Sequence, residues 1–274
     1  MSNLITRAIT GSIYVLSVIA AIFIHPMVCM AYFFVVAVIG LNEFYFNAKK
    51  TNIKPNIILG NILGIISYCI IILCSFCEEN LSSILYSCLI IVCLAIFIGE
   101  LYSKTKQPFT NIAYTFLGCI YVVVPLALTS LIINIKGDFS PMILMSVFIF
   151  AWCNDTFAYL TGRQFGKHKL FERISPKKTW EGSIGGFVSV IIAAIIISLC
   201  SNSLQVYDYI IIAVLTSIIG TWGDLTESMF KRQIGVKDSG KLLPGHGGIL
   251  DRFDILLLAI PMVYAYLKIR FGIY

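Results

Sequence analysis

Charged side chains are scarce in this sequence. Only 12% of its 274 residues are charged, whereas 58% are hydrophobic, and a soluble domain carries about 25% charged residues. No polar stretch is long enough to form a separate soluble domain. The composition therefore excludes an ordinary soluble protein and predicts an all-α, polytopic membrane protein.

Motifs that would define several other chemistries are also missing. The sequence contains no GxxxxGK[ST] phosphate loop and no HExxH zinc motif. Its nine cysteines give one CxxC pair, Cys74 and Cys77, without a second pair or a nearby histidine. Since a zinc site needs about four ligands, we interpret the cysteines as small buried apolar side chains. Internal repeats and low-complexity segments are absent as well.

Long apolar runs dominate what is present. A spanning helix needs about 20 apolar residues, and nine runs qualify as candidates: 8–24, 28–46, 56–76, 81–99, 110–134, 141–161, 183–200, 206–222 and 254–271. The first run resembles a signal peptide but lacks a clear small-residue cleavage site, so we interpret it as a retained helix. We expect a single integral unit, with about five spans in 1–140 and about four in 141–274.

The basic residues are distributed unevenly between the two sides of such a bundle. If the N-terminus is cytoplasmic, 17 of the 20 Lys and Arg residues lie on the cytoplasmic side, as the positive-inside rule requires. The net charge of +6 then reflects loops between apolar spans. We therefore expect anionic lipid head groups or a phosphate substrate as partners, and no nucleic acid.

Two polar loops, 162–182 and 224–254, interrupt the apolar pattern and hold 11 of the 20 basic residues. A transporter usually places its charges at mid-depth within the bundle. Here the charge gathers at one face, which favours chemistry at the membrane surface over transport.

The end of the eighth span carries polar residues at helical spacing. Asp224, Glu227, Ser228 and Lys231 are spaced i, i+3, i+4 and i+7, so a continuing helix places them on one face. This pattern indicates a metal-binding carboxylate with a phosphate-binding lysine. The alternative is an ordinary polar helix end at the membrane interface.

A glycine-rich turn precedes two more carboxylates, Asp251 and Asp254, at the start of the last span. The glycines of the Gly-His-Gly-Gly turn permit close approach to a phosphate, and His246 lies within that turn. Capping of a helix N-terminus is the alternative role for the carboxylates. Aspartates on separate elements suit Mg²⁺, and nearby Lys and Arg would neutralise a transferring phosphoryl or nucleotidyl group.

Two further groups of candidate residues lie in and just before the 162–182 loop. Asn154 and Asp155 lie inside an apolar span, where an ionisable residue is costly unless it is paired. In SPKKTWEG, Ser175 and Pro176 indicate a helix start, and Lys177 and Lys178 indicate a phosphate site. The alternatives are an ion pair for Asp155, and topology or lipid contact for the lysines.

Residues 228–254, SMFKRQIGVKDSGKLLPGHGGILDRFD, closely resemble the signature of the phosphatidate cytidylyltransferases, or CDP-diacylglycerol synthases. That signature runs Ser-x-x-Lys-Arg, Lys-Asp, Pro-x-His-Gly-Gly and Asp-Arg-x-Asp, and every position is filled. The segments WCNDTFAYLTGRQFGKHKL and ISPKKTWEG also resemble blocks of this family. Residues 1–140 are similar in hydropathy and length only.

The resemblance implies a reaction in which phosphatidate and CTP give CDP-diacylglycerol and pyrophosphate with Mg²⁺, and leaves a second cation open. It implies that Asp224 and Asp251 bind the metal and that Lys231 contacts phosphate. Asp254, Asp155 and Asn154 would support the metal or position water, and His246 would shape the nucleotide loop. The remaining substrate-binding candidates are Lys177, Lys178, Arg232, Lys237, Arg252, Ser175, Thr179 and Asp238.

Other activities and partners stay open at this point. A CTP-dependent transferase or kinase acting on another lipid, such as a polyprenol, would have a similar bundle. The Asp-x-x-Asp-Gly-x-x-Ala-Arg motif of CDP-alcohol phosphotransferases is absent. The family implies a homodimer, and we expect a bacterial cytoplasmic membrane with the site facing the cytoplasm.

Overall fold

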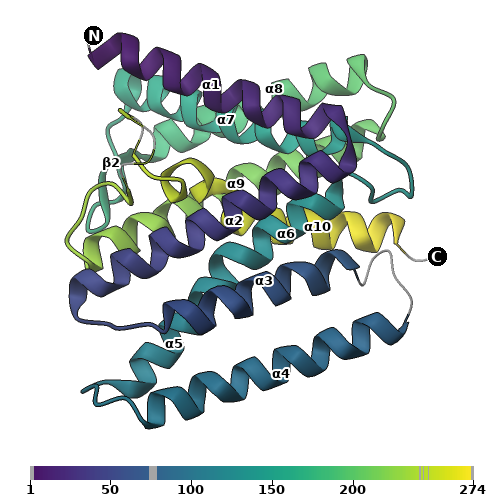
Figure 1. Ribbon diagram of the computed structural model, residues 1–274. Coiled ribbons are helices and arrows are strands. Elements are labelled where there is room, and N and C mark those ends of the chain that lie inside the picture. Colours follow the sequence, from purple (N-terminus) through teal and green to yellow (C-terminus); the bar gives the residue numbers. More distant parts are fainter. Residues whose placement is uncertain (1–2, 74–78, 241, 243, 246, 273–274) are drawn as a thin grey trace.

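The computed structural model describes residues 3–73, 79–240, 242, 244–245 and 247–272. Within them, nine long helical segments run between two ends of the molecule (Figure 1). They are α1 (Asn3–Ile24), α2 (Pro26–Ala48), α3 (Ile57–Leu73), α4 (Glu79–Leu101), a segment that joins α5 (Pro108–Gly118) to α6 (Val124–Ile132), α7 (Pro141–Phe165), α8 (Trp180–Cys200), α9 (Val206–Gln233) and α10 (Leu250–Phe271). A π-helical turn, Cys119–Val123, connects α5 to α6.

The helix starts follow from local sequence. α2, α5 and α7 each begin with proline, which suits the first helical position because that N–H has no partner inside the helix. His25 alone separates α1 from α2, and its Nδ1 accepts a hydrogen bond from the Met27 N–H at 3.2 Å. The two helices are therefore joined by a tight turn.

Seven of the described helices are long and apolar enough to cross a membrane. α3 is shorter, with 17 residues, and α10 carries charged residues near both of its ends. The prediction of an all-α, polytopic membrane protein is confirmed, and each predicted span corresponds to one of the nine segments. The division into two parts at residue 140 stays a prediction.

The connections at one end of the molecule are the basic ones. In Figure 1 the N-terminus, the β2 hairpin, and the connections after α2, α4 and α9 lie toward the left. The C-terminus and the connections after α1, α6 and α8 lie toward the right. The arrangement agrees with an odd number of crossings, and we call the left-hand end the polar end.

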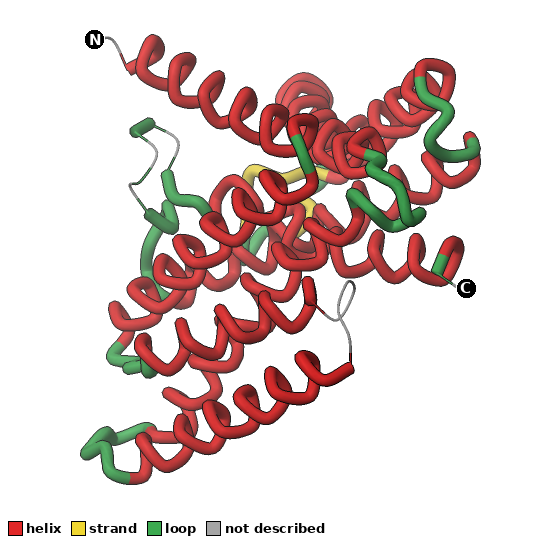
Figure 2. The backbone as a smooth tube through the Cα atoms, turned by 45° about the vertical axis from the view of Figure 1, so that its right-hand side comes forward, coloured by secondary structure: helices red, strands yellow, loops and turns green. Residues whose placement is uncertain are grey.

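A short hairpin at the polar end was not predicted from the sequence. β1 (Lys169–Phe171) pairs antiparallel with β2 (Ser175–Thr179), the sole sheet in the described part of the chain (Figure 2). The prediction of a helix start at Ser175 and Pro176 is wrong, because both residues lie in β2. Thr179 caps α8 instead, and its Oγ1 accepts a hydrogen bond from the Gly182 N–H at 3.2 Å.

Close helix packing fixes the polar end. α7 packs along α8, and α9 packs along α10. At Gly223 of α9, an added Cβ atom would lie 2.6 Å from the Asp254 carbonyl oxygen of α10, so only glycine permits this approach. Behind this contact, the rings of Phe33, Phe148 and Phe253 form an aromatic core that joins α2, α7 and α10.

At the opposite end of the molecule, a buried acid joins α9 to α10. Asp208 in the first turn of α9 is fully buried. It accepts hydrogen bonds from Tyr266 Oη at 2.5 Å and from the Gln205 N–H at 3.3 Å. Arg270 Nε lies 3.4 Å from the same carboxylate. These contacts join α9 to α10 far from the polar end.

Candidate functional site

A cavity of about 420 Å³ opens between α7, β2, α8 and α9 at the polar end. Ile255 of α10 also lines it. Six of the residues predicted from the sequence lie on its walls: Asn154, Asp155, Lys177, Lys178, Thr179 and Asp224. The hairpin brings the lysines to the cavity, and the long helices bring the acids.

Asp224 is the most closely paired acid of this cavity. Its Oδ2 forms an ion pair with Lys178 Nζ, and its Oδ1 accepts a 3.3 Å hydrogen bond from Ser228 Oγ, one turn further along α9. Lys178 is half-buried, whereas Lys177 is exposed. The two adjacent lysines therefore have different environments, as neighbouring positions on a strand usually do.

Two of the predicted substrate-binding residues, Asn154 and Thr179, form hydrogen bonds within the protein that stabilise the fold. Asn154 is buried, and its Oδ1 accepts a 2.7 Å hydrogen bond from Ser217 Oγ, which ties α7 to α9. Thr179 caps α8. Both side chains line the cavity, but their polar atoms already have protein partners.

A second polar cluster surrounds Lys231 and Asp251. Lys231 Nζ forms an ion pair with Glu227, one turn back on α9, and donates a 2.8 Å hydrogen bond to Asp251 Oδ1. Asp251 Oδ2 accepts hydrogen bonds from the backbone N–H groups of Ser239 at 2.9 Å and Gly248 at 2.8 Å. Glu227 is completely buried, so its charge depends on Lys231 for compensation.

Asp254 lies between the two clusters. Its carboxylate interacts electrostatically with Asp224, Asp155 and Glu227, and its Oδ1 accepts a 2.8 Å hydrogen bond from the Ile255 N–H. The hydroxyl of Tyr121, in the π-helical turn, interacts with the acids of both clusters. Its oxygen is buried without a hydrogen-bond partner among the described residues. The sequence did not predict a role for Tyr121, because nothing distinguishes one tyrosine in an apolar span.

The other predicted residues do not line the cavity. Ser175 is half-buried in β2, and Arg232 Nε donates a 3.3 Å hydrogen bond to the Ile174 carbonyl. Lys237 and Asp238 are exposed on the 234–249 loop, and Arg252 lies at the start of α10. His246 lies outside the described residues, as do Cys74 and Cys77.

The residues at the polar end fit a divalent cation by the chemistry of their oxygen atoms. Five carboxylates lie on α7, α9 and α10: Asp155, Asp224, Glu227, Asp251 and Asp254. Lys178, Lys231 and Arg252 interact with these acids, and Arg163 and Lys177 also line the cavity. No described group of three or more acidic, His or Cys side chains is preassembled for a metal. Mg²⁺ suits this arrangement, because it usually takes one or two carboxylates and completes its shell with water and phosphate.

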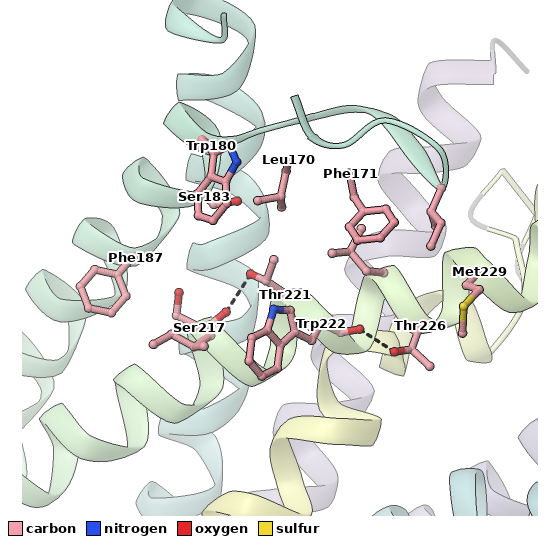
Figure 3. A pocket seen from close by; sticks show the side chains of 13 residues that line it. Leu170, Phe171, Trp180, Ser183, Phe187, Ser217, Thr221, Trp222, Thr226 and Met229 are labelled. Carbon is pink, nitrogen blue, oxygen red and sulfur yellow. Dashed lines mark hydrogen bonds between the residues drawn. The ribbon is translucent and has the colours of Figure 1, made fainter. Parts of the chain in front are cut away.

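An apolar groove of about 570 Å³ lies beside the polar cavity. Figure 3 shows Trp180, Ser183 and Phe187 on one helix facing Ser217, Thr221 and Trp222 on another. Leu170 and Phe171 from the hairpin cover the groove on the side that faces the polar end of the molecule. Ser183 and Thr221 also line the polar cavity, so the two spaces meet there.

The fold and the site together define a membrane-bound enzyme that handles an anionic substrate next to lipid. The chain belongs to the Cytidylyltransferase family, which it matches over residues 5–270. A phosphatidate cytidylyltransferase of Staphylococcus haemolyticus is 33% identical, over 94% of this chain and 96% of its own. That of Rickettsia prowazekii is 36% identical over 77% and 92% of the two chains. With that of Haemophilus influenzae, the identity is 51% over 43% of each chain. The family predicted from the 228–254 signature is confirmed.

Proposed function

We propose that this chain transfers the cytidylyl group of CTP to phosphatidate, giving CDP-diacylglycerol and pyrophosphate, at the polar end of the bundle. The observation that carries the proposal is the junction at Ser183 and Thr221, where a cavity holding Lys178 and Asp224 meets an apolar groove. A substrate with a phosphate head and hydrocarbon tails matches both spaces. The names of the full-length relatives agree with this activity.

The chemistry requires little more than the alignment of two polyanions. The phosphate oxygen of the lipid attacks the α-phosphorus of CTP in line, and pyrophosphate leaves. Because the nucleophile is already an anion, no strong general base is required. Lys178 and Lys177 would neutralise phosphate in the cavity, and Lys231 would do so from the second cluster. When Lys178 turns to a phosphate, Asp224 is released from its ion pair.

Mg²⁺ would supply charge neutralisation on the phosphates and hold them in line. We propose Asp224 and Asp251 as its protein ligands, with Asp155 and Asp254 adding negative charge nearby. The bound cation would offset part of the negative charge that these carboxylates and the substrate phosphates bring together. A second cation beside it stays a prediction.

The acyl chains would lie in the apolar groove of Figure 3. Its walls are α8 and α9, both long enough to cross the bilayer. The Trp180 and Trp222 side chains at its rim are 55% and 59% exposed, so the groove is accessible from the flank. A lipid could therefore enter sideways while its phosphate reaches Ser183 and Thr221.

The proposed topology follows from the basic loops. We place the polar end on the cytoplasmic side of a bacterial cytoplasmic membrane, where CTP is available, in agreement with the positive-inside rule. The homodimer implied by the resemblance stays a prediction. Transfer to another lipid, such as a polyprenol, is the alternative, because the groove selects hydrocarbon and not a particular head group.

The test is pyrophosphate release from CTP by purified protein in detergent, with phosphatidate and Mg²⁺. We expect release to depend on phosphatidate and to be lost in Asp251→Asn. Asp138→Asn is the matched control, because Asp138 is exposed in the connection between α6 and α7 at the opposite end. Activity with a polyprenol phosphate but not with phosphatidate would refute the substrate. Full activity of Asp251→Asn would refute the assignment of the metal.

A further inference from the structure

Glu43 is an acidic residue in the sequence NEFYFNA, in the second half of α2. It belongs to none of the motifs found in the sequence, and about 190 residues separate it from the glycine-rich loop. Nevertheless, its two carboxylate oxygens contact that loop. Oε1 accepts a hydrogen bond from Ser239 Oγ, and Oε2 accepts one from the Ile249 N–H at 2.7 Å.

Ser239 links Glu43 to the predicted catalytic acid Asp251. Its hydroxyl donates to Glu43, its N–H donates to Asp251 Oδ2 at 2.9 Å, and its carbonyl accepts from Asn47 Nδ2 at 2.5 Å. The side chain of Ser239 is buried. All polar groups of this one loop residue are therefore engaged, two with α2 and one with α10.

The glycines of the loop reflect the same contact. A Cβ atom at Gly240 would lie 2.5 Å from Glu43 Oε1, and one at Gly248 would overlap the Glu43 carboxylate. Neither glycine has a positive φ angle, so backbone conformation does not require glycine at these positions. The close approach of the Glu43 side chain requires it instead. Gly245 and Gly247, in contrast, have φ angles of +78° and +82°.

We propose that Glu43 is a positioning residue for the reaction, a role that rests on the proposed function. It holds both ends of the 239–249 segment against α2, which fixes the Ser239 and Gly248 N–H groups on Asp251 Oδ2. Asp251 Oδ1 is thereby directed to Lys231. Glu43 acts through the loop and does not contact the substrate.

The test compares Glu43→Gln with Glu100→Gln. Glu100 is the matched control, because it is a buried acid near a helix end, whereas Glu43 is half-buried, and it accepts hydrogen bonds from Thr105 and Asn111, away from this loop. In Glu43→Gln a neutral amide replaces the charged carboxylate, so the attachments of the loop to Ser239 and Ile249 lose their charge assistance and become weaker. We expect kcat to fall about 10-fold to 100-fold, as for small misplacements of reacting groups, with partial recovery in Glu43→Asp.

Hydrogen exchange supplies a readout that does not depend on activity. We expect faster exchange in residues 236–249 of Glu43→Gln, with α2 and α7 unchanged, and no such change in Glu100→Gln. Equal exchange in the loop of Glu43→Gln and wild type would overturn the proposal. So would an unchanged kcat, or a fall in kcat matched by accelerated exchange throughout the bundle. Wild-type protein that releases no pyrophosphate would instead refute the proposed function.

A double-mutant cycle tests whether contact with Glu43 is the reason that residue 240 is a glycine. Gly240→Ala is expected to lower activity in the wild-type background because its Cβ meets Glu43. In the Glu43→Ala background the same change should have a smaller effect, since the carboxylate is gone and the Gly248 Cα atom, at 3.1 Å, is the close neighbour that remains. Strictly additive losses would show that Gly240 is required for another reason.

Discussion

Substitution of Gly223 by alanine tests whether the spacing of α9 and α10 sets the geometry of the site. The new Cβ atom would lie 2.6 Å from the Asp254 carbonyl oxygen and 3.1 Å from the Ile255 carbonyl oxygen. Ordinary contacts begin at 3.4 Å, so the helices must separate locally by about 0.8 Å. Asp224 is adjacent to Gly223, and Asp254 carries the obstructed carbonyl group. The substitution therefore moves two predicted catalytic acids apart.

Two magnitudes follow. Overpacking of this kind costs about 1–3 kcal/mol of stability, so the midpoint of thermal unfolding in detergent should fall. A displacement approaching 1 Å at reacting groups lowers a rate by up to about 100-fold. We expect kcat for pyrophosphate release, measured well below the unfolding midpoint, to fall between about 10-fold and 100-fold.

Gly99→Ala is the matched control. Gly99 lies in α4, and a Cβ atom there would have its nearest neighbours at 3.8 Å, in ordinary contact. Since alanine also favours a helix over glycine, this variant should keep its activity and its stability. A Gly223→Ala enzyme with wild-type kcat would refute the reasoning, whether or not its stability falls, because the acids would then tolerate the displacement.

Four further outcomes are expected. Lys178→Met should lower kcat about 100-fold or more, because it removes a cation next to the transferring phosphate. Lys177→Met should mainly raise the KM for CTP, and equal effects of the two variants on kcat would contradict the different environments of these lysines. Asp208→Ala should lower the thermal midpoint, because the donors Tyr266 Oη and the Gln205 N–H lose a buried acceptor, and a buried donor left without a partner costs about 1–3 kcal/mol. The kcat at low temperature should stay unchanged, and a loss of kcat there would show that the far end of α9 is coupled to the site. Chelation of Mg²⁺ should stop pyrophosphate release, and undiminished release in excess chelator would exclude the proposed metal.

The helices were predictable because hydrocarbon imposes a simple requirement. A span needs about 20 apolar residues, and the nine predicted runs correspond to the nine helical segments. Part of the arrangement on α9 was predictable for a related reason: helical spacing places Glu227 and Lys231 on one face, and the structure joins them in an ion pair. Asp224 pairs with Lys178 of the hairpin instead.

The hairpin was not predictable in the same way. SPKKT resembles a helix start because Ser-Pro often precedes a helix, whereas the actual cap is Thr179, four residues later. A strand of five residues in a polar loop carries too little alternation to be recognised. Its pairing with 169–171 depends on tertiary contacts, among them the hydrogen bonds from the Lys167 and His168 N–H groups to Glu181.

The role proposed for Glu43 was not predicted from the sequence, although the sequence contains a signal for it. A single carboxylate within an apolar span is costly unless it has partners, and NEFYFNA contains one. Its partners, however, belong to a loop distant in sequence, and no local pattern connects them. Tyr121 had no comparable signal, since its significance comes from the π-helical turn and from the acids of two other helices.

The position of the groove has a kinetic consequence. Because its walls are two membrane-spanning helices, its occupant is supplied within the plane of the bilayer and not from the aqueous phase. The effective concentration of such a substrate is its mole fraction among the surrounding lipids. Dilution of phosphatidate with inert lipid should therefore slow the enzyme, whereas dilution of the same vesicles with buffer, at constant CTP, should leave the turnover per enzyme unchanged.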